Sequence, residues 1–95
     1  MNETRLEKIE EIWMDIHSML KHYITTEIMH ELDSSKLADD QPLIEGGIID
    51  SMNLIKLVAY IEESFGVGIG ENDLDIENFQ SLNALTAFIM KKRSG

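Results

Sequence analysis

The sequence predicts an all-α domain. Three segments carry apolar residues at steps of three and four, the spacing that aligns side chains on one face of a helix. Glycine and the chain's one proline stand between these segments, where helices end and loops begin. The chain has 95 residues, enough for one domain, and 43% of them are hydrophobic. Because these residues are periodic, we expect a small packed core and not a disordered chain.

The first helix is predicted to start at Thr4-Arg5-Leu6-Glu7, which has the pattern of a capping box. It is predicted to run to about Leu32. Its apolar stripe consists of Leu6, Ile9, Trp13, Ile16, Leu20, Tyr23, Ile24 and Ile28. The pair Thr25-Thr26 is the expected weak point of this long helix, because β-branched residues are mediocre helix formers.

A long loop is predicted from Asp33 to Ile49, where helical periodicity is absent. It contains Pro42 and the pair Gly46-Gly47. Loops of this length in compact domains carry function or pack through their own apolar residues. The residues expected to pack are Leu37, Leu43, Ile44 and Ile48.

The second helix is predicted from Ser51 to Phe65, with Gly66 at the usual stopping position. A glycine-rich stretch follows that lacks the patterns of a nucleotide-binding loop, and then a short helical turn over Glu71–Glu77. The last helix is predicted from Leu82 to about Lys92, with Ser81 as its cap. Its inward residues are expected to be Leu82, Leu85, Phe88 and Ile89.

The second helix has two separate apolar faces when its residues are placed at about 100° intervals. The expected core face consists of Leu54, Leu57, Val58, Ile61 and Phe65. A second strip consists of Met52, Ile55 and Ala59. A central helix could bury both faces, but methionine and isoleucine beside acidic residues are typical of a partner-docking surface. We therefore favour docking for the strip.

The chain has a formal net charge of −10. This excess of acidic residues argues against nucleic-acid binding, which depends on Lys and Arg. The negative charge either favours basic partner proteins or only keeps the chain in solution. There is no cysteine, so any thiol chemistry needs a thiol from outside the chain. No segment has the length of a membrane span or the layout of a signal peptide. We expect a cytoplasmic monomer that binds neither membrane nor nucleic acid.

Neither group of potential metal ligands has the spacing of a known site. The histidines of the first helix are His17, His22 and His30, which do not form an i, i+4 pair. The acidic residues Asp73, Asp75 and Glu77 lack the glycine and the final glutamate of an EF-hand. No histidine follows His30 that could serve as a base for Ser51, so we expect neither a metal site nor an enzyme.

Asp50 and Ser51 at the start of the second helix allow two interpretations. One of them could simply cap the helix. Alternatively, Ser51 could carry a phosphate-linked group, because a helix N-terminus offers free amide groups and partial positive charge. The physical chemistry of a helix start leaves both open.

The surrounding residues, Gly46-Gly47-Ile48-Ile49-Asp50-Ser51-Met52-Asn53-Leu54-Ile55, strongly resemble the phosphopantetheine attachment motif of the acyl carrier protein family. The resemblance continues through Glu62-Glu63-Ser64-Phe65-Gly66-Val67 and Asn78-Phe79-Gln80-Ser81-Leu82. It extends from about Asp40 to Ile89, which is over half of the chain.

The resemblance implies a four-helix acyl-carrier-like bundle with a long loop before the second helix and a short third helix. It implies one carrier domain over residues 1–95, with residues 1–17 as an N-terminal helical extension. A phosphopantetheinyl transferase would recognise Asp50 and attach 4'-phosphopantetheine from coenzyme A to Ser51. A ligase would load acyl or aminoacyl groups as thioesters, for delivery to transfer enzymes of fatty-acid, polyketide or aminoacyl-type biosynthesis.

The residues expected to dock partner enzymes are Met52, Asn53, Ile55, Lys56, Ala59, Glu62 and Glu63. Fatty-acid carriers usually have acidic residues where Asn53 and Lys56 stand. The loop from Gly66 to Phe79 looks longer than theirs, as in aminoacyl and D-alanyl carriers. These departures favour a specialised carrier. The alternative is an unmodified acidic helical adaptor, which would keep the exposed strip but have no use for Asp50 and Ser51.

Overall fold

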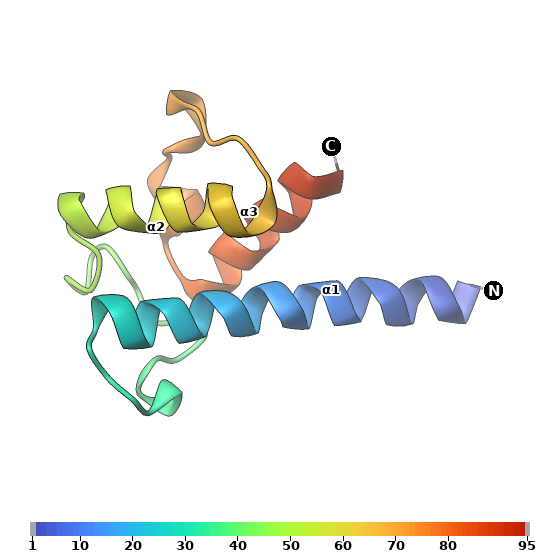
Figure 1. Cartoon of the computed structure of the whole chain (residues 1–95), viewed down its shortest axis with the longest axis horizontal. Helices are drawn as coiled ribbons and strands as arrows, with labels where there is room; N and C mark the ends of the chain where they lie inside the picture. The colour runs from blue at the N-terminus through green and yellow to red at the C-terminus, as the bar shows by residue number, and fades with distance from the viewer. Residues whose placement is uncertain (1, 95) are drawn as a thin grey trace.

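The computed structural model describes the backbone of residues 2–94 and the side chains of residues 7–93. This part of the chain forms three α-helices, α1 (Asn2–Tyr23), α2 (Ser51–Phe65) and α3 (Leu82–Ser94), and contains no strand. Helix α3 packs against α1, and Figure 1 shows the first turns of α1 extending beyond the other helices. The all-α prediction is confirmed.

Helix α1 starts earlier than predicted, because its backbone is already helical at Asn2. The predicted start at Thr4 is therefore wrong. The side chain of Thr4, which would form the capping box, lies outside the described residues.

At its other end α1 passes into a π-helical turn, η1 (Ile24–Ile28). The Thr25 hydroxyl donates to the carbonyl oxygens of Lys21 and His22 at 2.8 and 3.1 Å, and the Thr26 hydroxyl donates to that of His22 at 2.7 Å. These hydrogen bonds from side-chain hydroxyls to backbone carbonyl oxygens lie where the α-helix changes to the wider π turn. The weak point predicted at this threonine pair is confirmed.

The predicted helix end at Leu32 is wrong, since η1 ends at Ile28. His30 has a φ of 56° and is the one non-glycine residue among those described with a positive φ. This left-handed conformation cannot continue a right-handed helix. It stops the helix before Leu32, whose side chain is 97% exposed.

The loop between η1 and α2 packs down as predicted. Leu37 and Leu43 are fully buried, and Ile44 and Ile48 pack against the core. Ile49 is also buried, which the sequence did not predict. The loop contains one 3-10 turn, η2 (Ser34–Lys36), and Asp33 accepts a hydrogen bond from its backbone.

Two backbone hydrogen bonds connect this loop to the start of α3. The amide of Leu43 donates to the carbonyl oxygen of Gln80 at 2.9 Å. The amide of Asn83 donates to the carbonyl oxygen of Asp39 at 3.0 Å. The loop is therefore held by a segment about forty residues further along the chain.

The connection between α2 and α3 differs in detail from the prediction. Gly66 ends α2 in the left-handed conformation, with a φ of 66°. The single helical turn predicted over Glu71–Glu77 is instead two 3-10 turns, η3 (Glu71–Asp73) and η4 (Ile76–Phe79). As predicted, Ser81 caps α3, its hydroxyl oxygen accepting from the amide of Ala84 at 3.1 Å.

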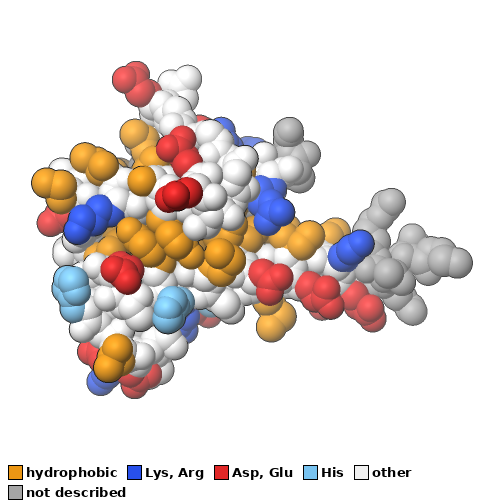
Figure 2. Space-filling model, in the orientation of Figure 1, with side chains coloured by type: hydrophobic (Ala, Val, Ile, Leu, Met, Phe, Trp, Pro, Cys, Tyr) orange, Lys and Arg blue, Asp and Glu red, His pale blue; other side chains and the backbone are white. Residues whose placement is uncertain are grey.

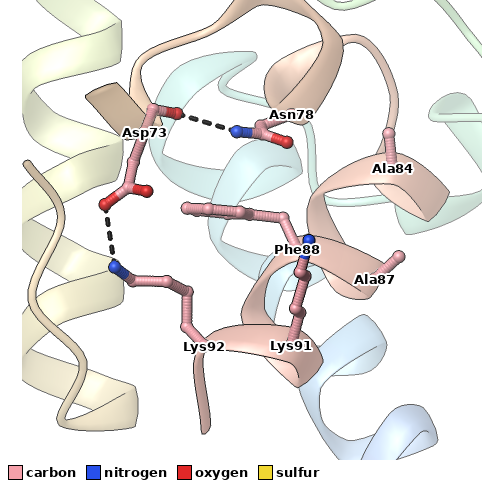
Figure 3. A pocket seen from close by; sticks show the side chains of 7 residues that line it. All are labelled: Asp73, Asn78, Ala84, Ala87, Phe88, Lys91 and Lys92. Carbon is pink, nitrogen blue, oxygen red and sulfur yellow. Dashed lines mark hydrogen bonds and ion pairs between the residues drawn. The ribbon is translucent and has the colours of Figure 1, made fainter. Parts of the chain in front are cut away.

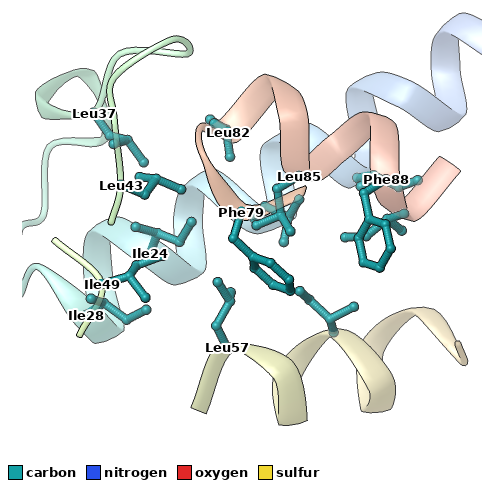
Figure 4. Packing of buried hydrophobic residues seen from close by; sticks show 14 residues of the cluster. Ile24, Ile28, Leu37, Leu43, Ile49, Leu57, Phe79, Leu82, Leu85 and Phe88 are labelled. Carbon is teal, nitrogen blue, oxygen red and sulfur yellow. The ribbon is translucent and has the colours of Figure 1, made fainter. Parts of the chain in front are cut away.

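All three helices and the loops contribute to one hydrophobic core, part of which is shown in Figure 4. Its fully or nearly fully buried members are Ile16, Leu20, Ile24, Ile28, Leu37, Leu43, Ile49, Leu57, Ile61, Phe79, Leu82, Leu85, Phe88 and Ile89. The four inward residues predicted for α3 are among them. The rings of Phe79 and Phe88 pack at a centroid distance of 5.9 Å, which joins η4 to α3.

An aromatic contact fastens α2 to α1. The rings of Tyr23 and Tyr60 stack at 4.0 Å, and the Tyr60 hydroxyl donates to the carbonyl oxygen of Met19 at 3.3 Å. Partial burial, together with the nearby Glu27, raises the pKa of Tyr23. Tyr60 is not part of the core face predicted for this helix, yet its ring packs against α1.

Candidate functional site

Asp50 and Ser51 have different positions and hydrogen bonding at the start of α2. Asp50 is the N-cap: its backbone is extended and its Oδ1 accepts from the amide of Asn53 at 2.8 Å. Ser51 is the first helical residue, and its exposed hydroxyl has no hydrogen-bond partner among the described residues. Capping is therefore performed by Asp50, which leaves the Ser51 hydroxyl available for chemistry.

The turn that leads to Ser51 requires two glycines. A Cβ atom on Gly46 would collide with the carbonyl oxygen of Pro42. Gly47 has a φ of 77°, a conformation that residues with a side chain rarely adopt. The turn is closed by hydrogen bonds from the amides of Ile48 and Ile49 to the carbonyl oxygen of Leu43, each 2.9 Å long.

A mostly apolar hollow of about 370 Å³ lies beside Ser51. It is lined by Ile44, Ile49, Asp50, Ser51, Leu54 and Ile76. Three separated parts of the chain contribute to it: the loop, α2 and η4. The sequence identified Asp50 and Ser51 but missed Ile44, Ile49 and Ile76 as neighbours, because nothing local in the sequence places these segments together.

The two apolar faces of α2 have very different surroundings. Leu57 and Ile61 on the core face are fully buried. Met52 and Ile55 on the second strip are 65% and 67% exposed, and Ala59 is exposed as well. Burial of the strip, the simpler alternative, is excluded in this chain. The strip has the exposure that docking requires, and its docking role stays a prediction.

The other predicted docking residues are not equivalent. Lys56 and Glu63 are exposed and free to meet a partner, while Asn53 is half-buried. The Glu62 carboxylate accepts a hydrogen bond from the amide of Ile69 at 3.0 Å. Glu62 therefore helps to hold the loop after α2, in addition to lying on the surface.

A larger hollow, of about 590 Å³, lies elsewhere, between α3 and the segment that precedes it. Figure 3 shows its lining residues: Asp73, Asn78, Ala84, Ala87, Phe88, Lys91 and Lys92. Asp73 pairs with Lys92 at 2.8 Å and accepts from the Asn78 side chain through its backbone oxygen at 3.0 Å. The ion pair between Asp73 and Lys92 thus connects the segment before α3 with the last turns of α3.

The described residues contain no group of three or more His, Cys, Asp or Glu side chains that could hold a metal ion. Of the three histidines considered as ligands, His17 contacts the carboxylate of Asp39 at 3.0 Å, so it bridges α1 and the loop. Within the same residues, no helix has the length and hydropathy needed to cross a membrane.

Residues 22–89 match the family model of the phosphopantetheine attachment site. The chain is 32% identical over 54 residues to a D-alanyl carrier protein of Lactococcus lactis subsp. lactis (strain IL1403), a match that covers 57% of this chain and 68% of that protein. It is 30% identical over 78 residues to an acyl carrier protein of Thermotoga maritima, covering 82% of this chain and 91% of that one.

The fold is also similar to a chain in a solved structure described as "Crystal structure of FAD-dependent dehydrogenase". The two share 33% sequence identity with a TM-score of 0.67, over 74% of this chain and 97% of the other. The family model covers the glycine turn, the N-cap and the exposed serine described above. The chain therefore belongs to the family of phosphopantetheine-bearing carrier proteins, which carry acyl or aminoacyl groups on a 4'-phosphopantetheine prosthetic group.

Proposed function

We propose that Ser51 bears the 4'-phosphopantetheine group, through which the chain delivers acyl or aminoacyl thioesters to partner enzymes. The observation that carries this proposal is the exposed, unpartnered Ser51 hydroxyl at the start of α2, next to a cap already supplied by Asp50. When bound, the prosthetic group supplies the thiol that this cysteine-free chain lacks.

The residues around Ser51 fit such a group. The amides of Ser51 and Met52 have no hydrogen-bond partner among the described residues, so they add to the partial positive charge of the helix N-terminus. A phosphodiester is favoured at such a position. The apolar side chains of Ile44, Leu54 and Ile76 border the hollow beside it and would support an uncharged chain.

Asp50 is proposed to have two roles. Its carboxylate fixes the first turn of α2 through the amide of Asn53 and thereby sets the direction of Ser51. Its side chain remains on the surface, where the modifying transferase can recognise it. Asp50 is therefore a positioning and recognition residue, and it performs no chemistry itself.

The remaining architecture supports the same function. We propose that η3 and η4 together take the place of a short third helix in an acyl-carrier-like four-helix bundle. Residues 1–95 would form one domain, with residues 1–17 as an N-terminal extension. The chain would act in the cytoplasm as a monomeric carrier and not as an enzyme, with catalysis left to its partners.

The proposed partners are a phosphopantetheinyl transferase, a ligase that loads the cargo, and enzymes that act on or transfer it. The fold comparison adds one class to test, because the similar chain comes from a structure described as an FAD-dependent dehydrogenase. Oxidation of a carried acyl or aminoacyl group by a flavin enzyme is a reaction that a specialised carrier would serve.

The attachment site is tested by intact-mass measurement after incubation with coenzyme A and a broad-specificity transferase. We expect a gain of about 340 Da, the mass of the prosthetic group. Ser51→Ala should show no gain while its circular dichroism spectrum stays unchanged, since Asp50 supplies the cap. Ser64→Ala, a change at an exposed serine of the same helix, is the matched control and should gain the full mass.

Two outcomes would contradict the assignment. A well-folded wild-type chain whose mass does not change would leave the unmodified acidic adaptor as the better function. A mass gain that persists in Ser51→Ala would mean that another side chain carries the prosthetic group.

A further inference from the structure

The first turns of α1 project beyond the core of the molecule (Figure 1). On α1, buried side chains begin at Ile16, which is 1% exposed, and continue with Leu20. Ile12 is partly buried, and all side chains of residues 7–11 are exposed. A helical segment without tertiary contacts is marginally stable in water, so this projecting segment lacks the support that the rest of α1 receives.

The apolar face of α1 continues along this projecting segment. Ile9 and Trp13 are four residues apart and lie in line with Ile16, so they extend the core-facing stripe outwards. Ile9 is 45% exposed, and the neighbouring Met14 is 64% exposed. Where this stripe extends beyond the core, no other part of the described chain fully covers its apolar side chains.

Two adjoining hollows give this face its shape. One, of about 320 Å³, is lined by Ile9, Glu10, Trp13 and Met14. The other, of about 250 Å³, also uses Trp13 and Met14 and is completed by His17, Ser18, Asp39 and Asn83. Because the two share Trp13 and Met14, they form one continuous surface from the projecting turns to the start of α3.

Acidic side chains accompany this apolar surface. Residues 7–15 include Glu7, Glu10, Glu11 and Asp15 but a single basic residue, Lys8. Figure 2 shows acidic side chains gathered along the projecting part of α1. A second copy of this chain would present the same charges, and like charges facing each other across an interface cost binding energy. A basic partner surface is complementary.

We propose that residues 7–15 of α1 dock in an apolar groove bordered by Lys or Arg on a partner protein, with Ile9, Trp13 and Met14 as the anchors. This is a helix-in-groove contact, in which Ile9 and Trp13 lie in line along the helix, Met14 lies to one side of them, and all three border the same hollow. Figure 1 places the start of α2 at the opposite end of the view, so a partner held here leaves Ser51 accessible. The contact is independent of the role of Ser51.

Trp13 is the only tryptophan of the chain and lies within the proposed surface, so its fluorescence reports directly on docking. The probe is a synthetic amphipathic helical peptide of leucine and lysine, titrated into the full-length protein without a prosthetic group. We expect a blue shift of the Trp13 emission and NMR amide shift changes confined to residues near Ile9 and Met14. The same peptide with glutamate for lysine is the charge control and should not bind.

The double variant Ile9→Ser with Met14→Ser should bind the lysine peptide about tenfold or more weakly. The matched control, Leu32→Ser with Leu74→Ser, removes two exposed apolar side chains that lie outside both α1 and α2, and it should bind like the wild type. If the first variant is unfolded by circular dichroism, Glu10→Lys with Glu11→Lys serves instead, and the expected loss of affinity is the same.

Three results would overturn the proposal. The first is peptide-induced shifts that map to Met52 and Ile55, and the second is the absence of any change at Trp13. The third is concentration-dependent self-association in sedimentation that is lost in Ile9→Ser with Met14→Ser, which would identify a second copy as the occupant. The mass test of Ser51 is unaffected by each of these results, so the two proposals fail separately.

Discussion

The two apolar faces of α2 have similar side chains and opposite surroundings. Leu57 and Ile61 are fully buried in the hydrophobic core, while Met52 and Ile55 on the adjoining strip are about two-thirds exposed. The hydrophobicity of these four side chains alone would not distinguish the buried pair from the exposed pair. The comparison teaches that one face of this helix stabilises the fold and the other is available to partner proteins.

The position of the strip gives it a functional meaning. Met52 follows Ser51 directly, and Ile55 and Ala59 continue the strip along the helix. A partner that covers the strip would therefore lie beside the proposed attachment site. Substitutions on the two faces should separate stability from partner function.

The largest effect is expected on the core face. Leu57→Ala removes a fully buried side chain and should lower the free energy of unfolding by roughly 2–5 kcal/mol, from lost burial and the cavity left behind. Urea denaturation followed by circular dichroism measures it. A loss below about 1 kcal/mol would mean that this face is not part of a packed core.

A smaller effect is expected at the start of the helix. Asp50→Ala removes the cap on the Asn53 amide and should cost about 1 kcal/mol of stability. It should also slow attachment of the prosthetic group, because the carboxylate orients Ser51 and is proposed to be recognised by the transferase. Ser81→Ala removes the cap of α3 and is the control: its stability should fall by a similar amount while attachment keeps its normal rate. Equal rates in both variants would contradict the recognition role of Asp50.

The exposed strip should matter little for stability. Met52→Ala and Ile55→Ala should change the free energy of unfolding by no more than about 0.5 kcal/mol. Each should lower the rate of cargo transfer to a partner enzyme, measured by the mass of the loaded carrier over time. Leu74→Ala, at an apolar residue exposed to 45% on the loop after α2, should leave that rate unchanged. If Ile55→Ala destabilises the chain as much as Leu57→Ala, the distinction between the faces is wrong.

The smallest effect is a local response to acid that should leave both faces of α2 in place. Hydrogen bonds from Lys92 and from the amide of Gly70 hold the pKa of Asp73 below its usual range. Its contribution to stability is therefore present above the ordinary aspartate pKa of about 3.9 and is lost as the pH falls through the lowered value. An NMR titration should show the Gly70 and Asn78 signals changing in that acidic range, and the change should be absent in Asp73→Asn.

Much of the fold could be predicted from the sequence because its helices have regular apolar spacing and clear ends. The boundaries of α2 follow from Asp50 and Gly66, both of which act through local backbone chemistry. The end of the first helix was missed because His30 adopts a left-handed conformation that its sequence neighbourhood does not specify. The burial of Tyr60 depends on its ring meeting Tyr23, a contact between two helices that no pattern within α2 reveals.

The candidate site also has a part that the sequence predicts and a part that depends on the tertiary fold. Asp50 and Ser51 were identified because the residues that define them are adjacent in the sequence and resemble a known motif. The hollow beside them could not be predicted, because Ile76 comes from a segment 25 positions after Ser51 and its place depends on the tertiary fold. The structure also assigns Glu62 a bond to the Ile69 amide that its position on the helix surface did not suggest.

The two backbone bonds between the loop and the start of α3 have a consequence for the order of events during synthesis. A chain still attached to the ribosome without Gln80 and Asn83 cannot form the bonds that these residues make to Leu43 and Asp39. Leu43 also holds the turn that leads to Ser51, because its carbonyl oxygen accepts hydrogen bonds from the amides of Ile48 and Ile49. If Ser51 is the attachment site, we expect chains that lack the last helix to be poorer substrates for the transferase than the 95-residue chain.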